Sequence, residues 1–253
     1  MSDLKTKYGF CKVSIAPLRA EKRDASEMVS QLLFGEPIEI LDTENSWLKI
    51  QSLVDGYIGF IDPKQVVSLS FKEVNRWLGN YQIEQNQLSQ IQTPWGNQWI
   101  SCGSYTTESE EFTIGNFHFN RLNSPLTNKI SILDRTNFFL NTPYLWGGKS
   151  TFGIDCSGFT QLVFQLDNIK LPRDAYQQEE MGSEVPFEDR EPGDLAFFSN
   201  AQGKVIHVGF VLDQNQLIHA SGLVRKDELK SDGIYSSING MKTHNLHSIK
   251  RYK

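Results

Sequence analysis

A cysteine lies between an aspartate and a serine in the stretch GIDCSGF, residues 153–159. Apolar residues follow Cys156 at spacings of three and four, as on the buried face of a helix. Cys156 therefore lies at the start of a predicted helix, where unpaired N–H groups and the helix dipole favour the reactive thiolate. Its neighbours Asp155, Ser157 and Gly158 are small or polar, whereas a cysteine that only fills a core would normally have apolar neighbours. The glycine also lets another backbone or a substrate approach closely. These neighbours therefore suit a nucleophile. The alternative is a small buried apolar side chain.

Two histidines could serve this cysteine. A thiol nucleophile needs a base within hydrogen-bond reach, and the base needs a third group that fixes its tautomer. His207 and His219 lie in the strand-like runs VIHVGFVL and LIHAS, so one ring can take the proton while the other orients it. An odd number of turn residues, or a bulge, would place both rings on one sheet face, whereas four turn residues would not. The alternative is a Cys/His/His metal site, for which no fourth ligand stands out. Three other histidines lack such neighbours and are interpreted as structural or surface residues: His118, His244 and His247.

The elements that must position these residues divide the chain into three predicted segments. Residues 1–68 contain short strand-like runs (CKVSI, PIEILD, WLKIQ and GYIGFI) separated by Gly, Pro and Asp, as in a small β-barrel. Residues 69–125 begin with the helix-like FKEVNRWLGNY and continue into strands, which predicts a second, divergent β-rich domain. After the linker-like LNSPLTNK, residues 126–253 combine helices with an antiparallel sheet. The predicted fold class is α+β.

Composition excludes several classes of function. The chain has 253 residues and a formal charge of −5, which gives no field to attract nucleic acid or anionic lipid. No apolar run approaches the roughly 18 residues of a membrane helix, and MSDLKTKYGF lacks the features of a signal peptide, so we expect a cytoplasmic protein. An export signal outside this sequence is the alternative. Cys11, Cys102 and Cys156 are too far apart in sequence to suggest a disulfide framework or a zinc knuckle.

Four segments together resemble the NlpC-type family of papain-like bacterial cell-wall cysteine peptidases. They are TPYLWGGKSTFGIDCSGF, EPGDLAFF, HVGFVL and HASG, in the order of that family. The resemblance implies a papain-like catalytic domain in which Cys156 is the nucleophile, His207 is the general base and later acid, and His219 orients His207. It also implies that the Tyr144 hydroxyl and the Cys156 N–H stabilise the oxyanion, a task that requires donors already aimed at the developing charge.

The longer phrases PYLWGG and LPRDAYQQ, preceded by the β-rich segments, are similar to γ-D-glutamyl-L-diamino acid endopeptidases with N-terminal bacterial SH3-like domains. Such enzymes cut the bond between D-glutamate and a diamino acid in murein peptides that have a free N-terminal L-alanine. Paired acceptors hold the ammonium group, so a blocked alanine would leave carboxylates unpaired. No metal or cofactor is implied. The substrate-binding residues implied by this resemblance are Glu27, Tyr57, Trp146, Asp155, Ser157 and Asp174. The sequence departs from the pattern at Ala175, where a serine is expected, and over 69–125.

Simpler roles exist for four of these residues. Glu27 could be an exposed carboxylate, Tyr57 an aromatic residue of the barrel core, and Asp174 a helix cap. Trp146 could pack under the cysteine loop. The function predicted is a cysteine endopeptidase that trims recycled murein tripeptides or tetrapeptides, as a monomer without nucleic-acid or membrane partners. The alternatives are an acyltransferase or amidase with the same three residues, or a non-catalytic protein that binds the cell wall.

Overall fold

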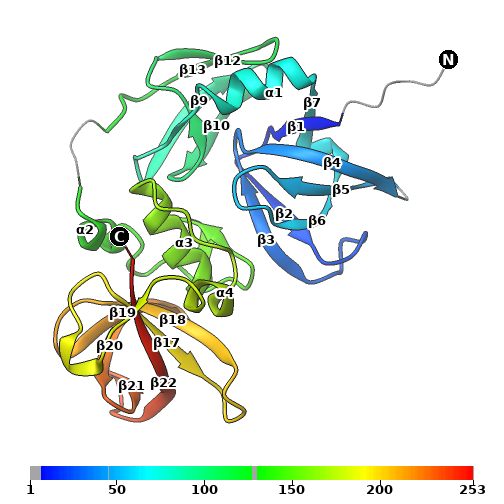
Figure 1. Ribbon diagram of the computed structural model, residues 1–253. Helices are drawn as coiled ribbons and strands as arrows, with labels where there is room; N and C mark the ends of the chain where they lie inside the picture. Colours follow the sequence, from blue (N-terminus) through cyan, green and yellow to red (C-terminus); the bar gives the residue numbers. More distant parts are fainter. Residues whose placement is uncertain (1–6, 45, 127–129, 253) are drawn as a thin grey trace. The chain divides into compact units, whose positions relative to one another are not determined.

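The computed structural model describes residues 7–44, 46–126 and 130–252. The first six residues of the stretch considered for export, and residues 127–129 of the predicted linker, lie outside the described residues. Two compact units make up the chain (Figure 1). The N-terminal unit holds Met1–Asn128 and also Lys149–Thr151, and the C-terminal unit holds Lys129–Gly148 and Phe152–Lys253. A short segment just before the candidate nucleophile therefore belongs to the N-terminal unit, which the sequence did not predict.

The first part of the N-terminal unit is an antiparallel sheet in the order β3-β2-β6-β5-β4-β1-β7. Leu48 and Ile50 point into its core, and Gly56 has the positive φ of a turn between two strands. The run CKVSI, predicted as one strand, is divided between two strands that pair with different neighbours. The strands are β1 (Tyr8–Cys11), β2 (Ile15–Arg19), β3 (Met28–Leu33), β4 (Pro37–Glu44), β5 (Trp47–Ser52), β6 (Ile58–Ile61) and β7 (Val66–Leu69), with a short 3-10 helix at Pro63–Gln65.

The second part of this unit begins with helix α1 (Phe71–Leu78), which the sequence predicted and which a capping box of Ser70 and Glu73 starts. Its largest sheet has the order β10-β9-β13-β12. Phe10 and Phe34 from the first part share one hydrophobic core with Trp77 and Phe119 from the second. The predicted segments 1–68 and 69–125 are therefore packed together as one unit. The remaining strands are β8 (Gln82–Ile83), β9 (Leu88–Thr93), β10 (Gly96–Ser101), β11 (Tyr105–Thr106), β12 (Glu111–Ile114), β13 (Phe117–Arg121) and β14 (Lys149–Ser150).

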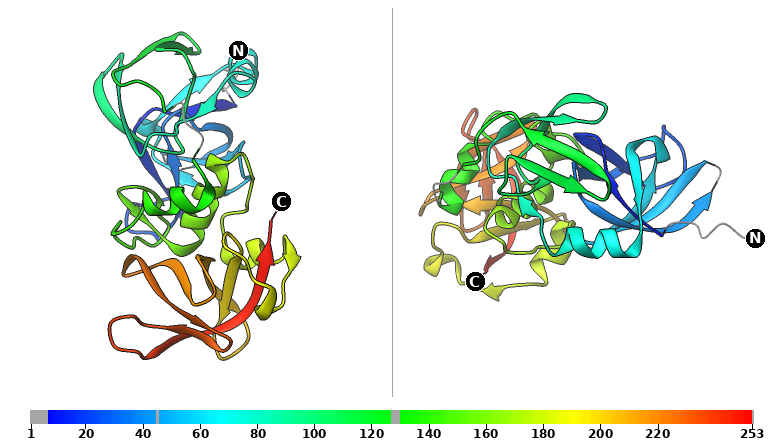
Figure 2. Two further views of the ribbon diagram at one scale, coloured as in Figure 1. Left: turned by 90° about the vertical axis from the view of Figure 1, so that its left-hand side faces the viewer. Right: turned by 90° about the horizontal axis from the view of Figure 1, so that it is seen from above.

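The C-terminal unit is an antiparallel sheet with helices packed against it (Figure 2). The strand order is β16-β22-β17-β18-β19-β20-β21, and β22 also pairs with β21, so the sheet closes on itself. The elements are α2 (Ile132–Asn137), β15 (Gly153–Ile154), α3 (Cys156–Leu166), α4 (Ala175–Glu179), β16 (Ser183–Glu184), a 3-10 helix at Phe187–Asp189, β17 (Leu195–Ser199), β18 (Val205–Val211), β19 (Gln216–Ser221), β20 (Leu223–Lys230), β21 (Gly233–Tyr235) and β22 (Lys242–Arg251).

Helix α3 is the central helix of this unit, and it packs against β18 and β19. The apolar stripe predicted from the sequence is fully buried, with Phe159, Leu162 and Val163 each 0% exposed. Phe159 and Phe164 contact Phe210 of β18 through their rings, with centroids 5.4 Å apart in both pairs. These aromatic contacts fix the helix on the sheet that carries the two histidines. Among the described helices, none is long and apolar enough to cross a membrane.

Candidate active site

Cys156 is the first residue of α3, and the residue before it caps the helix. The Asp155 carboxylate accepts a hydrogen bond from the Gly158 N–H at 2.7 Å and another from the Gly147 N–H at 2.8 Å. The first contact satisfies an N–H that the helix cannot pair internally, and the second ties the preceding loop to the helix start. Asp155 therefore fixes the backbone on both sides of the cysteine. The substrate contact predicted for Asp155 stays a prediction.

Arg173 neutralises this buried carboxylate. Its guanidinium reaches both oxygens of Asp155, at 3.0 Å and 2.6 Å, and also donates to the Ser157 hydroxyl at 3.0 Å and the Gly148 carbonyl at 3.3 Å. Arg173 is 2% exposed, so the pair is held where solvent screening is weak. The arginine was part of the quoted phrase LPRDAYQQ, but sequence reasoning assigned it no role.

Only glycine fits at position 158, because the backbone of the preceding loop leaves no room for a side chain there. A Cβ at position 158 would lie 2.2 Å from the Gly148 carbonyl oxygen, closer than any real contact. Glycine at position 158 therefore lets the preceding loop pass directly over the first turn of α3, which is the close backbone approach predicted from the sequence.

Cys156 is 7% exposed as a whole residue, and burial raises the pKa of its thiol to about 12. The Asp155 charge acts in the same direction, while the N–H groups of Val208 and Ser157 favour the thiolate. A helix start by itself lowers the pKa of a cysteine, which is the effect expected from the sequence; in the structure, burial outweighs this effect. The Val208 N–H belongs to the residue that follows His207, so β18 brings its backbone to the sulfur.

His207 and His219 lie on the same face of the sheet. The register pairs Gly209 with His219 and Val211 with Leu217, so an odd number of residues, 212 to 216, lies between the last pair. An odd number places both rings on one face, as expected from the sequence. His207 lies two residues before Gly209, the direct partner of His219. The His207 Nε2 lies 2.7 Å from the His219 Nδ1. Burial lowers the pKa of His207 well below its ordinary value, and the neighbouring His219 and His244 act in the same direction.

A carboxylate contacts His219 on the ring nitrogen that does not face His207. Asp227 of β20 is 5% exposed, and its Oδ2 lies 3.0 Å from the His219 Nε2. Burial alone would raise the pKa of Asp227, but hydrogen bonds from His219 and Ser237 outweigh it and hold the pKa well below its ordinary value. Asp227 lies in the sequence RKDELK, residues 225–230, which carries no local signal for a site. Its contact with His219 depends on the pairing of β19 with β20.

His244 is a third residue, after Arg173 and Asp227, to which sequence reasoning assigned no role in the site. Its ring stacks on His207, with centroids 4.3 Å apart and planes at 21°. Burial lowers the pKa of His244 to about 4, with a further contribution from His219. His244 was interpreted as structural or surface; it is half-buried and covers one face of the candidate base.

Tyr144 precedes the glycine-rich loop, and its N–H donates to the Gly222 carbonyl at 3.0 Å. Burial raises the pKa of its hydroxyl far above the ordinary value, with the charges of Cys156 and Asp155 acting in the same direction. The hydroxyl therefore stays protonated and can donate a hydrogen bond near the cysteine. Trp146 is 60% exposed, so packing under the loop does not bury this ring.

The remaining residues predicted in the C-terminal unit have identifiable contacts. Ser157 is buried and accepts from Arg173. Asp174 is the N-cap residue of α4, and its N–H donates to the Gln177 side chain at 3.4 Å. Ala175, the departure from the family pattern, is 9% exposed at the first position of α4. Substrate contacts by Ser157 and Asp174 stay predictions.

Two predicted residues, Glu27 and Tyr57, belong to the N-terminal unit. Glu27 is exposed directly before β3. Tyr57 lies before β6, packs partly against the barrel core, and its N–H donates to Asp55 at 3.0 Å. Tyr57 thus contributes to the barrel core, the simpler role considered for it from the sequence. Their role in binding an ammonium group stays a prediction.

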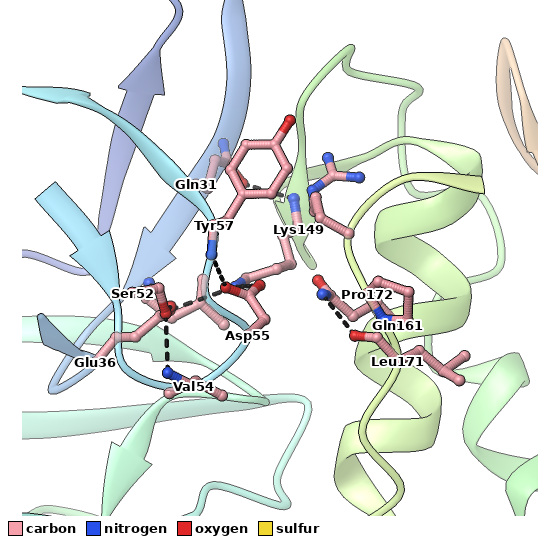
Figure 3. Close-up of polar contacts among 12 residues, drawn as sticks. Gln31, Glu36, Ser52, Val54, Asp55, Tyr57, Lys149, Gln161, Leu171 and Pro172 are labelled. Carbon is pink, nitrogen blue, oxygen red and sulfur yellow. Dashed lines mark hydrogen bonds and ion pairs between the residues drawn. The ribbon is translucent and has the colours of Figure 1, made fainter. Parts of the chain in front are cut away.

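A buried charge cluster anchors the inserted segment of the N-terminal unit (Figure 3). The Lys149 Nζ lies 3.4 Å from Glu36 and 3.9 Å from Asp55, and the Lys149 N–H donates to Gln31 at 2.8 Å. Glu36 is 0% exposed and also accepts from the Ser52 hydroxyl at 2.7 Å. Burial raises the pKa of Glu36, whereas Lys149 acts in the opposite direction. Sequence reasoning missed this cluster because its members are far apart along the chain.

A different polar contact in Figure 3 lies in the C-terminal unit, where the Gln161 amide of α3 donates to the Leu171 carbonyl at 3.0 Å. It ties the helix to the segment that leads to Arg173. Across the described ranges, no three His, Cys, Asp or Glu side chains come together as metal ligands.

A cysteine at a helix start, a histidine pair on the neighbouring strands and a tyrosine hydroxyl are the parts of a thiol hydrolase. Residues 141–243 match the model of the NlpC/P60 family, and residues 18–66 match that of the bacterial dipeptidyl-peptidase Sh3 domain. A probable endopeptidase of Haemophilus influenzae is 30% identical over 142 residues, which cover 55% of this chain and 81% of that protein. The chain belongs to the NlpC/P60 family.

Two relatives are named Gamma-D-glutamyl-L-lysine dipeptidyl-peptidase. The Bacillus subtilis protein is 43% identical over 91 residues, which cover 35% of this chain and 31% of that protein. The Bacillus cereus protein is 26% identical over 238 residues, which cover 81% of this chain and 71% of that protein. A solved NlpC/P60 family protein from Bacillus cereus has the same fold, with a TM-score of 0.77 at 21% identity. The match covers 97% of this chain and 99% of the Bacillus cereus chain.

Proposed function

We propose that this chain is a cysteine peptidase that cleaves the γ-D-glutamyl–diamino acid bond of murein peptides with a free N-terminal L-alanine. The observation that carries the chemistry is the His207–His219 contact of 2.7 Å, on the sheet against which the Cys156 helix packs. The bond specificity is supported by the names of the two Bacillus relatives and by the match of residues 18–66 to a dipeptidyl-peptidase domain.

In this proposal the nucleophile is activated during attack. The pKa of Cys156 is raised and that of His207 is lowered, so the resting pair is a neutral thiol and a neutral imidazole. As the sulfur attacks the γ-glutamyl carbonyl carbon, the thiol proton passes to His207, and the carbonyl electrons move onto oxygen. The Tyr144 hydroxyl and the Cys156 N–H donate to that oxyanion.

Three further proton transfers complete the cycle. His207 returns the proton to the amine of the diamino acid as the C–N bond breaks, which leaves a thioester on Cys156. Water then attacks the thioester while His207 accepts one of its protons. As the C–S bond breaks, L-Ala-D-Glu leaves and His207 returns this proton to the sulfur, which regenerates the thiol. We further propose that Glu27 and Asp174 accept hydrogen bonds from the L-alanine ammonium group, which makes a blocked N-terminus a poor substrate.

Mass spectrometry of L-Ala-γ-D-Glu-meso-diaminopimelate and L-Ala-γ-D-Glu-L-Lys, each with a free or acetylated N-terminus, tests this function. Wild-type protein should release L-Ala-D-Glu from the free peptides, and Cys156→Ala should release none. Cys102→Ala is the matched control, because Cys102 is a buried cysteine of the N-terminal unit. Glu27→Gln should reduce the preference for the free peptides.

Three results would contradict parts of the proposal. Turnover by Cys156→Ala would exclude this nucleophile. Transfer of the glutamyl group to an added amine, without hydrolysis, would indicate an acyltransferase. Equal cleavage of free and acetylated peptides by the wild-type protein would exclude recognition of the ammonium group.

A further inference from the structure

Next to β18 in the sheet lie β19 and then β20, and these two strands extend the line of polar contacts beyond the histidine pair. The register of β19 and β20 pairs Leu217 with Asp227 and His219 with Arg225. Asp227 therefore lies on the same sheet face as His219, two residues from its direct partner. The resulting contacts run from His207 through His219 to Asp227, at 2.7 Å and 3.0 Å.

The other oxygen of Asp227 already has two donors. Its Oδ1 accepts from the Ser237 N–H at 2.8 Å and from the Arg225 guanidinium at 2.7 Å. Both groups can only donate, so this oxygen cannot carry a proton directed at either of them. The ion pair with Arg225 and the lowered pKa of Asp227 keep this carboxylate as an anion, so its Oδ2 also lacks a proton and can only accept from His219.

The direction of each remaining hydrogen bond follows from that anion. The His219 Nε2 must carry hydrogen to donate to Asp227, so the Nδ1 of the neutral ring has a lone pair. That lone pair faces the His207 Nε2, which must therefore carry the hydrogen of their shared contact. In neutral His207 the lone pair is then on Nδ1, the nitrogen that does not contact His219.

We propose that Asp227 is a positioning residue that, through His219, sets the tautomer of His207 and leaves its Nδ1 as the base for Cys156. This inference rests on the proposed function for the roles of Cys156 and His207. When His207 takes the thiol proton, its Nε2–H still donates to His219, and the Asp227 anion stabilises the positive charge through that ring.

A purely structural role for Asp227 makes a different prediction. Asp227 also joins β20 to the Ser236–Gly240 turn through the Ser237 N–H, so its loss could simply loosen that turn. Such a role would lower stability and leave the tautomer of His219 unchanged. The tautomer is therefore the readout that separates the two roles.

The substitution Asp227→Asn inverts the proposed hydrogen bond without changing the shape of the side chain. Arg225 and Ser237 both require an acceptor, so the amide oxygen takes the Oδ1 position and the NH₂ group faces the His219 Nε2. That nitrogen must then carry the lone pair, and the hydrogen moves to Nδ1. His207 would receive this hydrogen bond on Nε2 and carry its own hydrogen on Nδ1, where it cannot accept the thiol proton.

The first experiment is ¹⁵N NMR of the histidine rings in the Cys156→Ala protein, with His219→Asn used for assignment. Without further substitution, His219 should show a protonated Nε2 and an unprotonated Nδ1. Adding Asp227→Asn should exchange the two signals. The matched control is Asp232→Asn, because Asp232 is an exposed carboxylate in the turn before β21. An Nδ1–H tautomer in the parent protein, or no exchange in Asp227→Asn, would overturn the inference.

Turnover of L-Ala-γ-D-Glu-L-Lys gives the second readout. The corresponding carboxylate-to-amide change beside the histidine of a serine protease costs about 10⁴ in kcat, and here a ring intervenes, so we expect a loss of about 10²–10⁴ in kcat. KM should change little. In a protein that already carries His219→Asn, adding Asp227→Asn should cause no further loss of kcat, since its effect passes through His219. If Asp227→Asn lowered kcat as much in that variant as in the wild-type protein, Asp227 would have an independent structural role. Inactive wild-type protein would contradict the proposed function, while the NMR result would still decide the tautomer.

Discussion

Replacing Gly209 by alanine is expected to displace His219 from His207. A Cβ at position 209 would lie 2.8 Å from the His219 Cβ and 2.9 Å from the Ile218 carbonyl oxygen. Carbon atoms pack at about 3.5 Å or more, so the His219 side chain must retreat by about 0.7 Å. The His207–His219 contact of 2.7 Å would then lengthen beyond a normal hydrogen bond.

The expected effect is a loss of about 10²-fold in kcat, the usual consequence of misplacing a catalytic group by about 1 Å. Overpacking of this kind also destabilises a core by about 1–3 kcal/mol. The assay is release of L-Ala-D-Glu under saturating substrate, with calorimetry on the same preparation to measure the loss of stability.

Gly203→Ala is the matched control for this substitution. Gly203 lies in the turn before β18, and a Cβ there meets nothing within 4 Å, although its φ of 80° makes alanine strained. It should lower stability by about 1 kcal/mol with little change in kcat. If Gly209→Ala kept kcat within twofold of wild type while Gly203→Ala behaved as expected, the reasoning that Gly209 makes room for His219 would be refuted.

Two further predictions concern stability. Arg173→Met leaves the Asp155 carboxylate buried without its cation and should reduce the free energy of unfolding, measured by urea denaturation, by about 3–5 kcal/mol. The control is the surface substitution Lys242→Met, which breaks an exposed pair with Asp232 and should cost less than about 1 kcal/mol. Equal losses for the two variants would contradict a special role for the buried pair. His207 and His244 are neutral in the folded protein with lowered pKa values, about 4 for His244, so the unfolded chain binds more protons below its histidine pKa of about 6.5. Stability should therefore fall as the pH drops from about 6.5 toward 4, and His244→Phe should reduce this loss; a melting temperature that rises over that range would contradict the assignment.

The sequence alone located the candidate chemistry because its signals are local. The period of the apolar residues after Cys156 predicts a helix that begins there, and Asp174 precedes the next helix as a cap. Alternation and turn residues predicted the strands that carry His207 and His219. Each of these features depends on residues within about one or two turns of the position concerned.

The tertiary structure decided which of those residues meet. The four residues DQNQ, 213–216, separate the strand-like runs VIHVGFVL and LIHAS in the sequence. Pairing of Val211 with Leu217 nevertheless leaves an odd number of residues between the strands, and this puts both rings on one face. Sheet register is set by packing along the whole strand, which a short turn sequence does not specify. The same register places Asp227 behind His219.

Burial and long-range pairing decided the rest. His244 stacks on His207 because β22 pairs with both β17 and β21, and Arg173 reaches Asp155 from a segment that follows α3. The helix start alone predicts an acidic thiol at Cys156, yet the surrounding core raises its pKa, since desolvation depends on every group packed around the sulfur. The sequence by itself determined the reactive residue types and their local elements; only the folded chain determined their neighbours, their protonation and the direction of their hydrogen bonds.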